Sequence, residues 1–231
     1  MRESILTIPI NEVFEPRDGC PICAMRNTVE QHISEYIMGA AMMEPDVRIE
    51  TNKLGFCGEH YNMLLKQNNR LSLALMLNTH LAERRAAMFD GKGGLKRYSK
   101  KSELEKQTCF VCEKVNWGIE HMLGTLFNMW NDEGFQRLYA SQQYICVQHY
   151  DLLMVHAMKK LKKDKLQSFV EVTDKLVNKY MEQLNADVQQ FCDSFDYRNA
   201  AKLHNDDMEH VRSSIERAIE FLTSRKPETK K

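Results

Sequence analysis

The feature that most constrains this chain is a pattern of cysteine and histidine residues that occurs twice. Two CxxC motifs begin at Cys20 and Cys109, and two CxxH motifs begin at Cys57 and Cys146. The second copy of each motif follows the first by the same offset, since 109 − 20 and 146 − 57 both equal 89. An offset held at every position without an insertion indicates an internal duplication. The pattern consists of Cys20, Cys23, Cys57, His60, Cys109, Cys112, Cys146 and His149.

These motifs predict two metal sites of the Cys₃His type. Zinc takes four nitrogen or sulfur ligands in a tetrahedron, and two donors one helical turn apart can both reach one ion. We expect each site to use the CxxC and CxxH of one repeat, with a bend at Pro45 bringing Cys57 back beside Cys20. Three thiolates and one imidazole fill the coordination shell, as is typical of structural zinc. The sequence therefore predicts two zinc ions per chain.

Other uses of these cysteines stay open. Cysteine together with histidine can also hold an iron–sulfur cluster. A CxxC motif can be a redox pair, although the βαβ setting of thioredoxin-like motifs is missing from this sequence. A lone cysteine is often a small buried apolar residue, which is our interpretation of Cys192. The sequence contains no GxSxG, HExxH or phosphate-binding glycine loop, so it identifies no catalytic residue.

The spacing of apolar residues predicts an all-α fold. The 231 residues include only ten Gly and five Pro, which disfavours a protein built from many tight turns. Segment 5–14 alternates in part and contains Pro9, so we expect an extended N-terminal arm there. Apolar side chains recur at three- and four-residue steps elsewhere. This periodicity predicts helices over residues 24–43, 46–52, 60–64, 71–88, 166–191 and 208–222.

The repeats and the composition predict four consecutive segments. The first, 1–89, holds the N-terminal arm and the first Cys₃His unit. A basic linker rich in Gly and Lys follows at 90–103. The second Cys₃His unit occupies 104–165, and C-terminal helices that pack on the units occupy 166–231.

Charge and hydropathy narrow the classes of partner. The chain has 32 Lys and Arg against 32 Asp and Glu, so its formal net charge is zero. Nothing in this balance favours nucleic acid or an anionic membrane. The N-terminal residues do not form the apolar stretch of a signal peptide, and apolar runs elsewhere are too short to cross a bilayer. We expect a cytoplasmic protein, where metal ligation is favoured over disulfides, with a protein partner and an oligomeric state that the sequence leaves open.

Four blocks of the sequence are distinctive: CPIC at Cys20–Cys23, PDVRIETNKLGFCGEH at Pro45–His60, NRLSLALMLNTHL at Asn69–Leu81 and FDYRN at Phe195–Asn199. These blocks resemble an uncharacterised bacterial family. That family occurs mainly in anaerobic Gram-positive bacteria and is known only as a domain of unknown function. The resemblance implies a bacterial cytosolic protein with Cys/His metal motifs and no assigned activity.

Three functional hypotheses follow from the sequence. The closed ligand sets favour a zinc-stabilised helical protein that acts in binding or as an adaptor. A metal or redox sensor is another hypothesis. An enzyme or metallochaperone would need a site between the repeats, formed by His32, His121, Asp196 and Arg198. The two histidines lie nine residues beyond the second Cys of their CxxC, half a turn away in direction, so we interpret them as buried, hydrogen-bonded residues.

Overall fold

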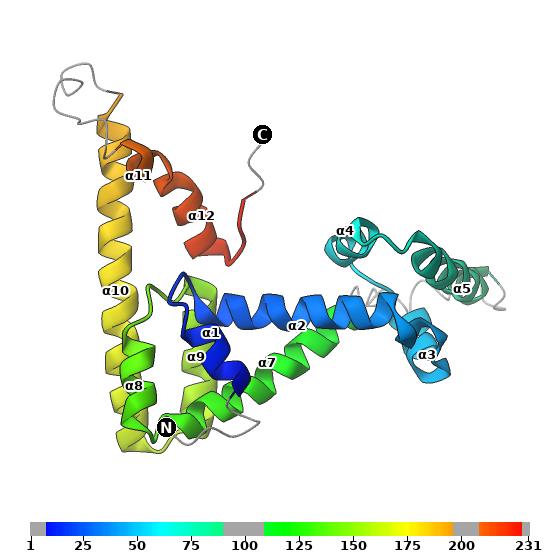
Figure 1. Cartoon of the computed structure of the whole chain (residues 1–231), viewed down its shortest axis with the longest axis horizontal. Coiled ribbons are helices and arrows are strands. Elements are labelled where there is room, and N and C mark those ends of the chain that lie inside the picture. Colours follow the sequence, from blue (N-terminus) through cyan, green and yellow to red (C-terminus); the bar gives the residue numbers. More distant parts are fainter. Residues whose placement is uncertain (1–7, 90–108, 196–207, 228–231) are drawn as a thin grey trace. The chain divides into compact units, whose positions relative to one another are not determined.

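The computed structural model describes residues 8–89, 109–195 and 208–227, and every regular element among them is a helix (Figure 1). The predicted all-α fold is confirmed. The basic linker expected at 90–103 lies outside the described residues, and so do residues 196–199 of the FDYRN block. Of the helices that are described, none has the length and hydropathy needed to span a membrane.

The chain divides into two compact units. Unit 1 combines the residues up to Met25 with those from His121 onward, and unit 2 comprises Arg26–Glu120. The division falls inside α2 (Pro21–Met38) and inside α7 (Phe110–Met129). Each of these two long helices therefore contributes residues to both units.

An aromatic core organises unit 1. Besides parts of α2 and α7, this unit contains α1 (Ile8–Phe14), α8 (Glu133–Ala140), α9 (Val147–Lys160), α10 (Lys163–Asp193), α11 (Met208–Arg212) and α12 (Ser214–Thr223). Six buried rings, from four of these helices and from the residue that follows α7, pack edge-to-face, stacked or tilted, with centroids 4.9 to 6.4 Å apart. They are Phe14, Phe127, Trp130, Phe135, Tyr139 and Phe169.

The N-terminal segment corrects one expectation, because residues 8–14 form the helix α1 and not an extended arm. Helical spacing places Ile10, Asn11 and Phe14 on one face, and all three side chains are buried. Pro9 occupies the first turn, where a missing N–H costs no intrahelical hydrogen bond. Burial of Phe14 in the aromatic core thus decides the local structure. Residues 5–7 of the expected arm lie outside the described chain.

The two C-terminal helices pack against α10 and α9 within unit 1. The last predicted helix is interrupted at Ser213, which separates α11 from α12. Tyr144 stacks on Tyr180 of α10 at 4.3 Å, and Phe221 of α12 contacts both rings, at 5.8 and 5.3 Å. These aromatic contacts bring the end of α12 to the start of α9.

Unit 2 is built around α5 (Arg70–Phe89). It also contains η1 (Ala40–Met43), α3 (Pro45–Leu54) and α4 (Gly58–Lys66), together with parts of α2 and α7. Arg48 of α3 donates to the carbonyl of Leu75 at 3.0 Å and to Thr79 Oγ1 at 2.6 Å, which joins α3 to α5.

Gly55 ends α3 and turns the chain toward Cys57. Its φ of +65° lies in the left-handed region, and a Cβ atom here would come within 2.8 Å of the His80 ring. Only glycine satisfies both constraints at low cost. Its carbonyl accepts from the N–H of Phe110 at 3.0 Å, so this turn also holds the beginning of α7.

Candidate metal centres

The eight residues of the repeated pattern form two clusters of three cysteines and one histidine. In each cluster, the four donor atoms all lie within 4.8 Å of one another. Site A belongs to unit 1 and site B to unit 2. Site A consists of Cys20, Cys23, Cys146 and His149, and site B consists of Cys57, His60, Cys109 and Cys112.

The pairing of the motifs is crossed, and our expectation that each repeat closes its own site was wrong. The first CxxC meets the second CxxH in site A, and the first CxxH meets the second CxxC in site B. Within unit 2, the Gly55 carbonyl accepts from the N–H of Phe110 at 3.0 Å, which places the turn before Cys57 beside the second CxxC.

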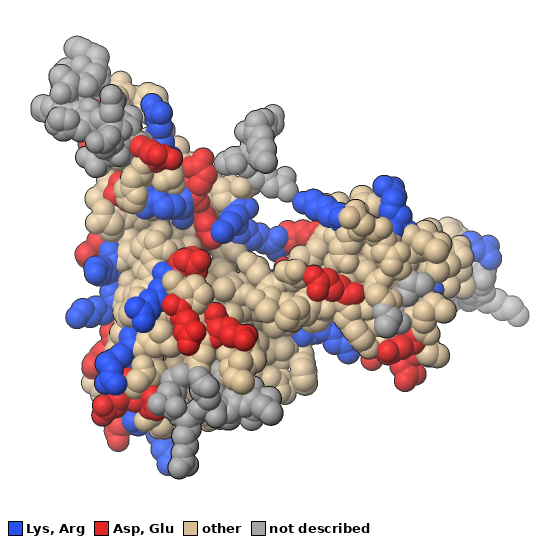
Figure 2. Space-filling view, viewed as in Figure 1, with Lys and Arg blue, Asp and Glu red and all other residues tan. Residues whose placement is uncertain are grey.

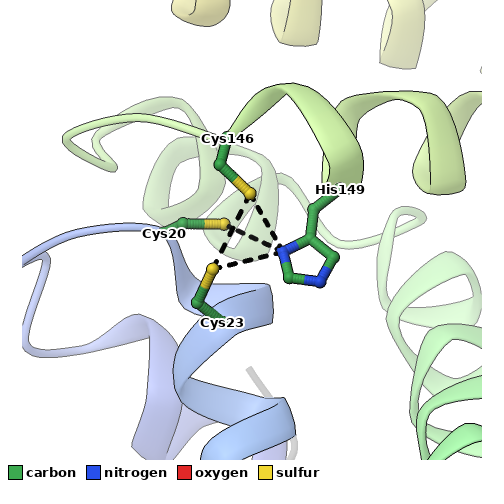
Figure 3. Close-up of side chains that lie close together, drawn as sticks. All are labelled: Cys20, Cys23, Cys146 and His149. Atoms are coloured by element: carbon green, nitrogen blue, oxygen red, sulfur yellow. Dashed lines mark hydrogen bonds between the residues drawn. The ribbon is translucent and has the colours of Figure 1, made fainter. Parts of the chain in front are cut away.

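Site A gathers its donors from the starts of α2 and α9 (Figure 3). The Nδ1 atom of His149 lies 3.1 Å from Cys146 Sγ, 3.3 Å from Cys23 Sγ and 3.7 Å from Cys20 Sγ. The sulfurs of Cys23 and Cys146 are 3.7 Å apart. Cys20, Cys146 and His149 are buried and Cys23 is half-buried, so the cluster is largely shielded from solvent.

Site B has the same arrangement at the starts of α4 and α7. His60 Nδ1 lies 3.0 Å from Cys57 Sγ, 3.3 Å from Cys109 Sγ and 3.4 Å from Cys112 Sγ. The sulfurs of Cys57 and Cys112 are 3.9 Å apart. Cys109 and His60 are buried, whereas Cys57 and Cys112 are half-buried, so site B is the more accessible of the two.

Helix N-termini supply the electrostatic setting of both sites. Cys57 and Cys146 are the N-cap residues of α4 and α9, and each has an extended backbone. Cys20 and Cys109 directly precede the first residues of α2 and α7. The free N–H groups and positive end of a helix stabilise a thiolate, so two helix starts converge on each cluster to favour bound sulfur anions.

Proton affinities in site B reflect how closely the donors are packed. Burial opposes ionisation of Cys109, but hydrogen bonds from His60 and the backbone lower the pKa of this thiol to about 6. Burial and the adjacent Cys109 charge raise the pKa of Cys112 to about 12. Burial disfavours a charged His60, yet hydrogen bonds with Cys109 and Glu30 raise its pKa to about 10. A metal ion must therefore displace protons here.

In site A, Cys146 is the cysteine whose thiol loses its proton most readily. Hydrogen bonds from the thiols of Cys20 and Cys23 lower the pKa of Cys146 far below its ordinary value. Burial is the main cause that raises the pKa of Cys20 to about 12, and the hydrogen bond with Cys146 raises the pKa of Cys23. Three sulfurs this close favour one shared negative charge until a cation neutralises them.

Among the described residues, Glu30 and Ser224 lie outside the repeated pattern and touch the clusters, and we predicted neither from the sequence. Glu30 of α2 accepts from His60, with Oε1 2.6 Å from Nε2. Ser224, in the left-handed conformation at the end of α12, has its Oγ 3.1 Å from Cys146 Sγ. The one sequence signal for Glu30 is its place seven residues after Cys23, two turns along the same helix. Ser224 has no such signal.

The remaining candidates do not form a site within the described residues. His32 and His121 are both exposed, so our interpretation of them as buried histidines was wrong. Asp196 and Arg198, the other members of the predicted enzyme site, lie outside the described chain. Cys192 belongs to neither cluster and is exposed, which corrects the expectation that it is a buried apolar residue.

Comparison with known proteins gives a family and no activity. The model of the family described as "Family of unknown function (DUF6062)" matches residues 1–229. Searches of curated proteins and of solved structures give no significant match. Because the family match spans nearly all of the 231 residues, and both candidate metal centres lie inside it, the chain belongs to the family of unknown function DUF6062.

Proposed function

We propose that this protein binds two zinc ions, one at site A and one at site B, and that both ions are structural. The single observation that carries the proposal is the convergence of three sulfurs and one imidazole nitrogen within 4.8 Å in each cluster. Four such donors match the number and kind of ligands that a structural zinc site uses.

The spacing of the donors fits a tetrahedral zinc ion. With Zn–S bonds of about 2.3 Å and Zn–N bonds of about 2.0–2.1 Å, tetrahedral angles place two sulfurs about 3.8 Å apart. The same geometry places a sulfur and a nitrogen about 3.6 Å apart. The sulfurs of Cys23 and Cys146 are 3.7 Å apart and those of Cys57 and Cys112 are 3.9 Å apart, and the S···N separations run from 3.0 to 3.7 Å. The other sulfur pairs lie within 4.8 Å. Small adjustments of the side chains would seat an ion in either cluster.

The ligand sets favour a structural role over catalysis. Catalytic zinc has three protein ligands and keeps one position for water, whereas four protein donors leave none. Both sites have the same composition, so neither is specialised for chemistry. Each ion would join the starts of two helices that are distant in sequence. Zinc in this position supplies folding free energy directly.

A helical binding or adaptor protein is the role that we assign to this scaffold. Exposed apolar side chains on α5 support a protein partner, because Leu71 and Leu75, one turn apart, are 68% and 41% exposed. Acidic and basic side chains are interspersed along α10 (Figure 2), a pattern that does not favour nucleic acid. The common offset of 89 residues supports descent from a duplicated unit. With the resemblance described above, the proposal includes a bacterial, cytoplasmic setting.

Metal analysis of the purified protein tests this proposal. We expect two zinc ions per chain by elemental analysis and no visible absorption band. Extraction by a chelator should be slow and should follow the loss of helical circular dichroism. Bound iron with a visible band, or protein that stays metal-free under reducing conditions, would contradict the proposal. Zinc-dependent hydrolysis with an unchanged fold would favour an enzyme instead.

A further inference from the structure

The imidazole of His60 is held at both of its nitrogen atoms. Its Nδ1 faces the three sulfurs of site B at 3.0 to 3.4 Å, and its Nε2 lies 2.6 Å from Glu30 Oε1. The His60 side chain is 3% exposed and that of Glu30 is 20% exposed, so little water competes for this contact. Because the Glu30 carboxylate accepts the proton of Nε2, the proton that a metal ion displaces is the one on Nδ1, and the Nδ1 lone pair then faces the cluster.

Site A lacks this contact in the part of the chain that the structure describes. His149 also directs Nδ1 at its three sulfurs, but no carboxylate holds its Nε2 among the described residues. The residue 89 positions after Glu30 is Ile119, whose buried side chain cannot accept a hydrogen bond. The repeat therefore preserves the ligands and changes the residue that supports the histidine.

We propose that Glu30 is the positioning residue of site B. It fixes the ring of His60 and raises the zinc affinity of site B by a contact that site A lacks among the described residues. This inference rests on the proposed zinc function. A carboxylate that accepts from a metal-bound histidine fixes the tautomer and ring orientation and raises the basicity of the ligand. Loss of such a partner costs about 10- to 100-fold in metal affinity. Among the described residues, no carboxylate makes that contribution at site A.

Three variants of the full-length protein test the role of Glu30. Glu30→Leu removes the acceptor and introduces an apolar side chain of the same size as that of Ile119 in the other repeat. Glu30→Gln removes the charge and keeps an oxygen that can accept from Nε2. Glu35→Gln removes the same charge from an exposed position on α2 and is the matched control, because Glu35 contacts Gln31 and not the cluster.

The first readout is the rate of zinc transfer to a chromophoric chelator. We expect two phases, and the phase lost in Cys112→Ser belongs to site B. Glu30→Leu should accelerate that phase by about 10- to 100-fold, Glu30→Gln by less, and Glu35→Gln not at all. The phase of site A should not change in any of the three variants.

The second readout is the imidazole ¹⁵N NMR spectrum, which a purely structural role of Glu30 would not alter in this way. We expect a slowly exchanging Nε2–H signal for His60 that is lost in Glu30→Leu and retained in Glu30→Gln. Unchanged release and exchange in Glu30→Leu would overturn the inference, as would equal acceleration of both phases with loss of helix. Wild-type protein that binds no zinc would instead refute the proposed function.

Discussion

The sulfur atoms of Cys23 and Cys146 lie 3.7 Å apart, although 123 positions separate the two residues in sequence. The Cys57–Cys112 contact of 3.9 Å repeats this relationship across 55 positions in the other cluster. Each contact joins a residue of the first repeat to a residue of the second. Neither repeat can therefore complete a metal site by itself.

Pairs of ligand substitutions will report the crossed pairing through metal content. Cys23→Ser with Cys146→Ser removes two ligands from site A, so we expect one zinc ion per chain to remain. Cys23→Ser with Cys57→Ser damages both sites, so we expect both ions to be lost. Elemental analysis of the two double variants, purified under reducing conditions, gives the numbers.

If each repeat closed its own site, the expected metal contents of the two double variants would be exchanged. Cys23→Ser with Cys57→Ser would then keep one ion, and Cys23→Ser with Cys146→Ser would keep none. That result would reject the crossed arrangement. Circular dichroism of both variants provides the control, since the comparison requires that each retain helical structure.

Single substitutions should separate ligands from the seventh cysteine. Cys146 is fully buried in site A, whereas Cys192 is exposed on α10. Loss of a structural zinc ligand should cost several kcal/mol, which corresponds to a fall in Tm of about 10 °C or more. Cys192→Ser should stay within about 0.5 kcal/mol of the wild type. The Tm of Cys146→Ser and of Cys192→Ser, measured by thermal unfolding, tests this prediction. Equal destabilisation by both substitutions would contradict the division into ligand and non-ligand cysteines.

Zinc binding to site B should strengthen as the pH rises. The pKa of His60 is raised to about 10 and that of Cys112 to about 12, so both hold protons near pH 7 that zinc must displace. Release of two protons makes the apparent affinity rise about 100-fold per pH unit over this range. Chelator competition at pH 6.5, 7.5 and 8.5 measures the slope. A slope below one proton would contradict the expected charge state.

The C-terminal helices should depend on one buried carboxylate. Asp187 of α10 is only 6% exposed and accepts from Arg217 of α12 and His210 of α11, each at 3.0 Å. Asp187→Asn leaves Arg217 without its counter-charge, which should cost roughly 3 kcal/mol. Asp193→Asn alters an acid of the same helix whose side chain accepts from Gln189, and should be nearly silent in thermal unfolding.

The same carboxylate predicts the direction of a pH effect. Burial raises the pKa of Asp187, but hydrogen bonds from Gln183 and Arg217 outweigh it, and the pKa falls below its ordinary value of 3.8. A lowered folded-state pKa means that the stabilisation is complete above pH 3.8 and is lost as the pH falls further. Asp187→Asn should therefore weaken the acid dependence of Tm. An unchanged acid dependence would show that other carboxylates dominate.

The sequence predicted which eight residues form the two clusters but not how their motifs pair, for a definite physical reason. Spacing within CxxC and CxxH is a local property, so all eight donors could be named. The two copies are alike, however, and nothing in the motifs specifies which CxxC meets which CxxH. That choice depends on contacts between elements remote in sequence, such as the hydrogen bond from the Phe110 N–H to the Gly55 carbonyl, which no motif predicts.

Tertiary contacts account for the other differences. Pro9 misled the prediction for residues 8–14, because burial of Phe14 against Phe135 and Tyr139 outweighed the extended tendency of the segment. Glu30 lies next to His60 only after α2 and α4 are in place. Contacts between elements remote in sequence leave no periodic trace, and a single sequence cannot reveal them.

The crossed pairing also gives the chain a nested topology during synthesis. Site B joins residues 49 positions apart, as between His60 and Cys109, and this shorter loop lies inside the loop of 123 positions that Cys23 and Cys146 close. Loop-closure entropy makes the longer closure cost about 0.8 kcal/mol more. On a ribosome, the inner ring has all of its donors before residue 146 is made. The zinc ion that we propose at site B would therefore close this inner ring first, and site A would close the outer ring after it.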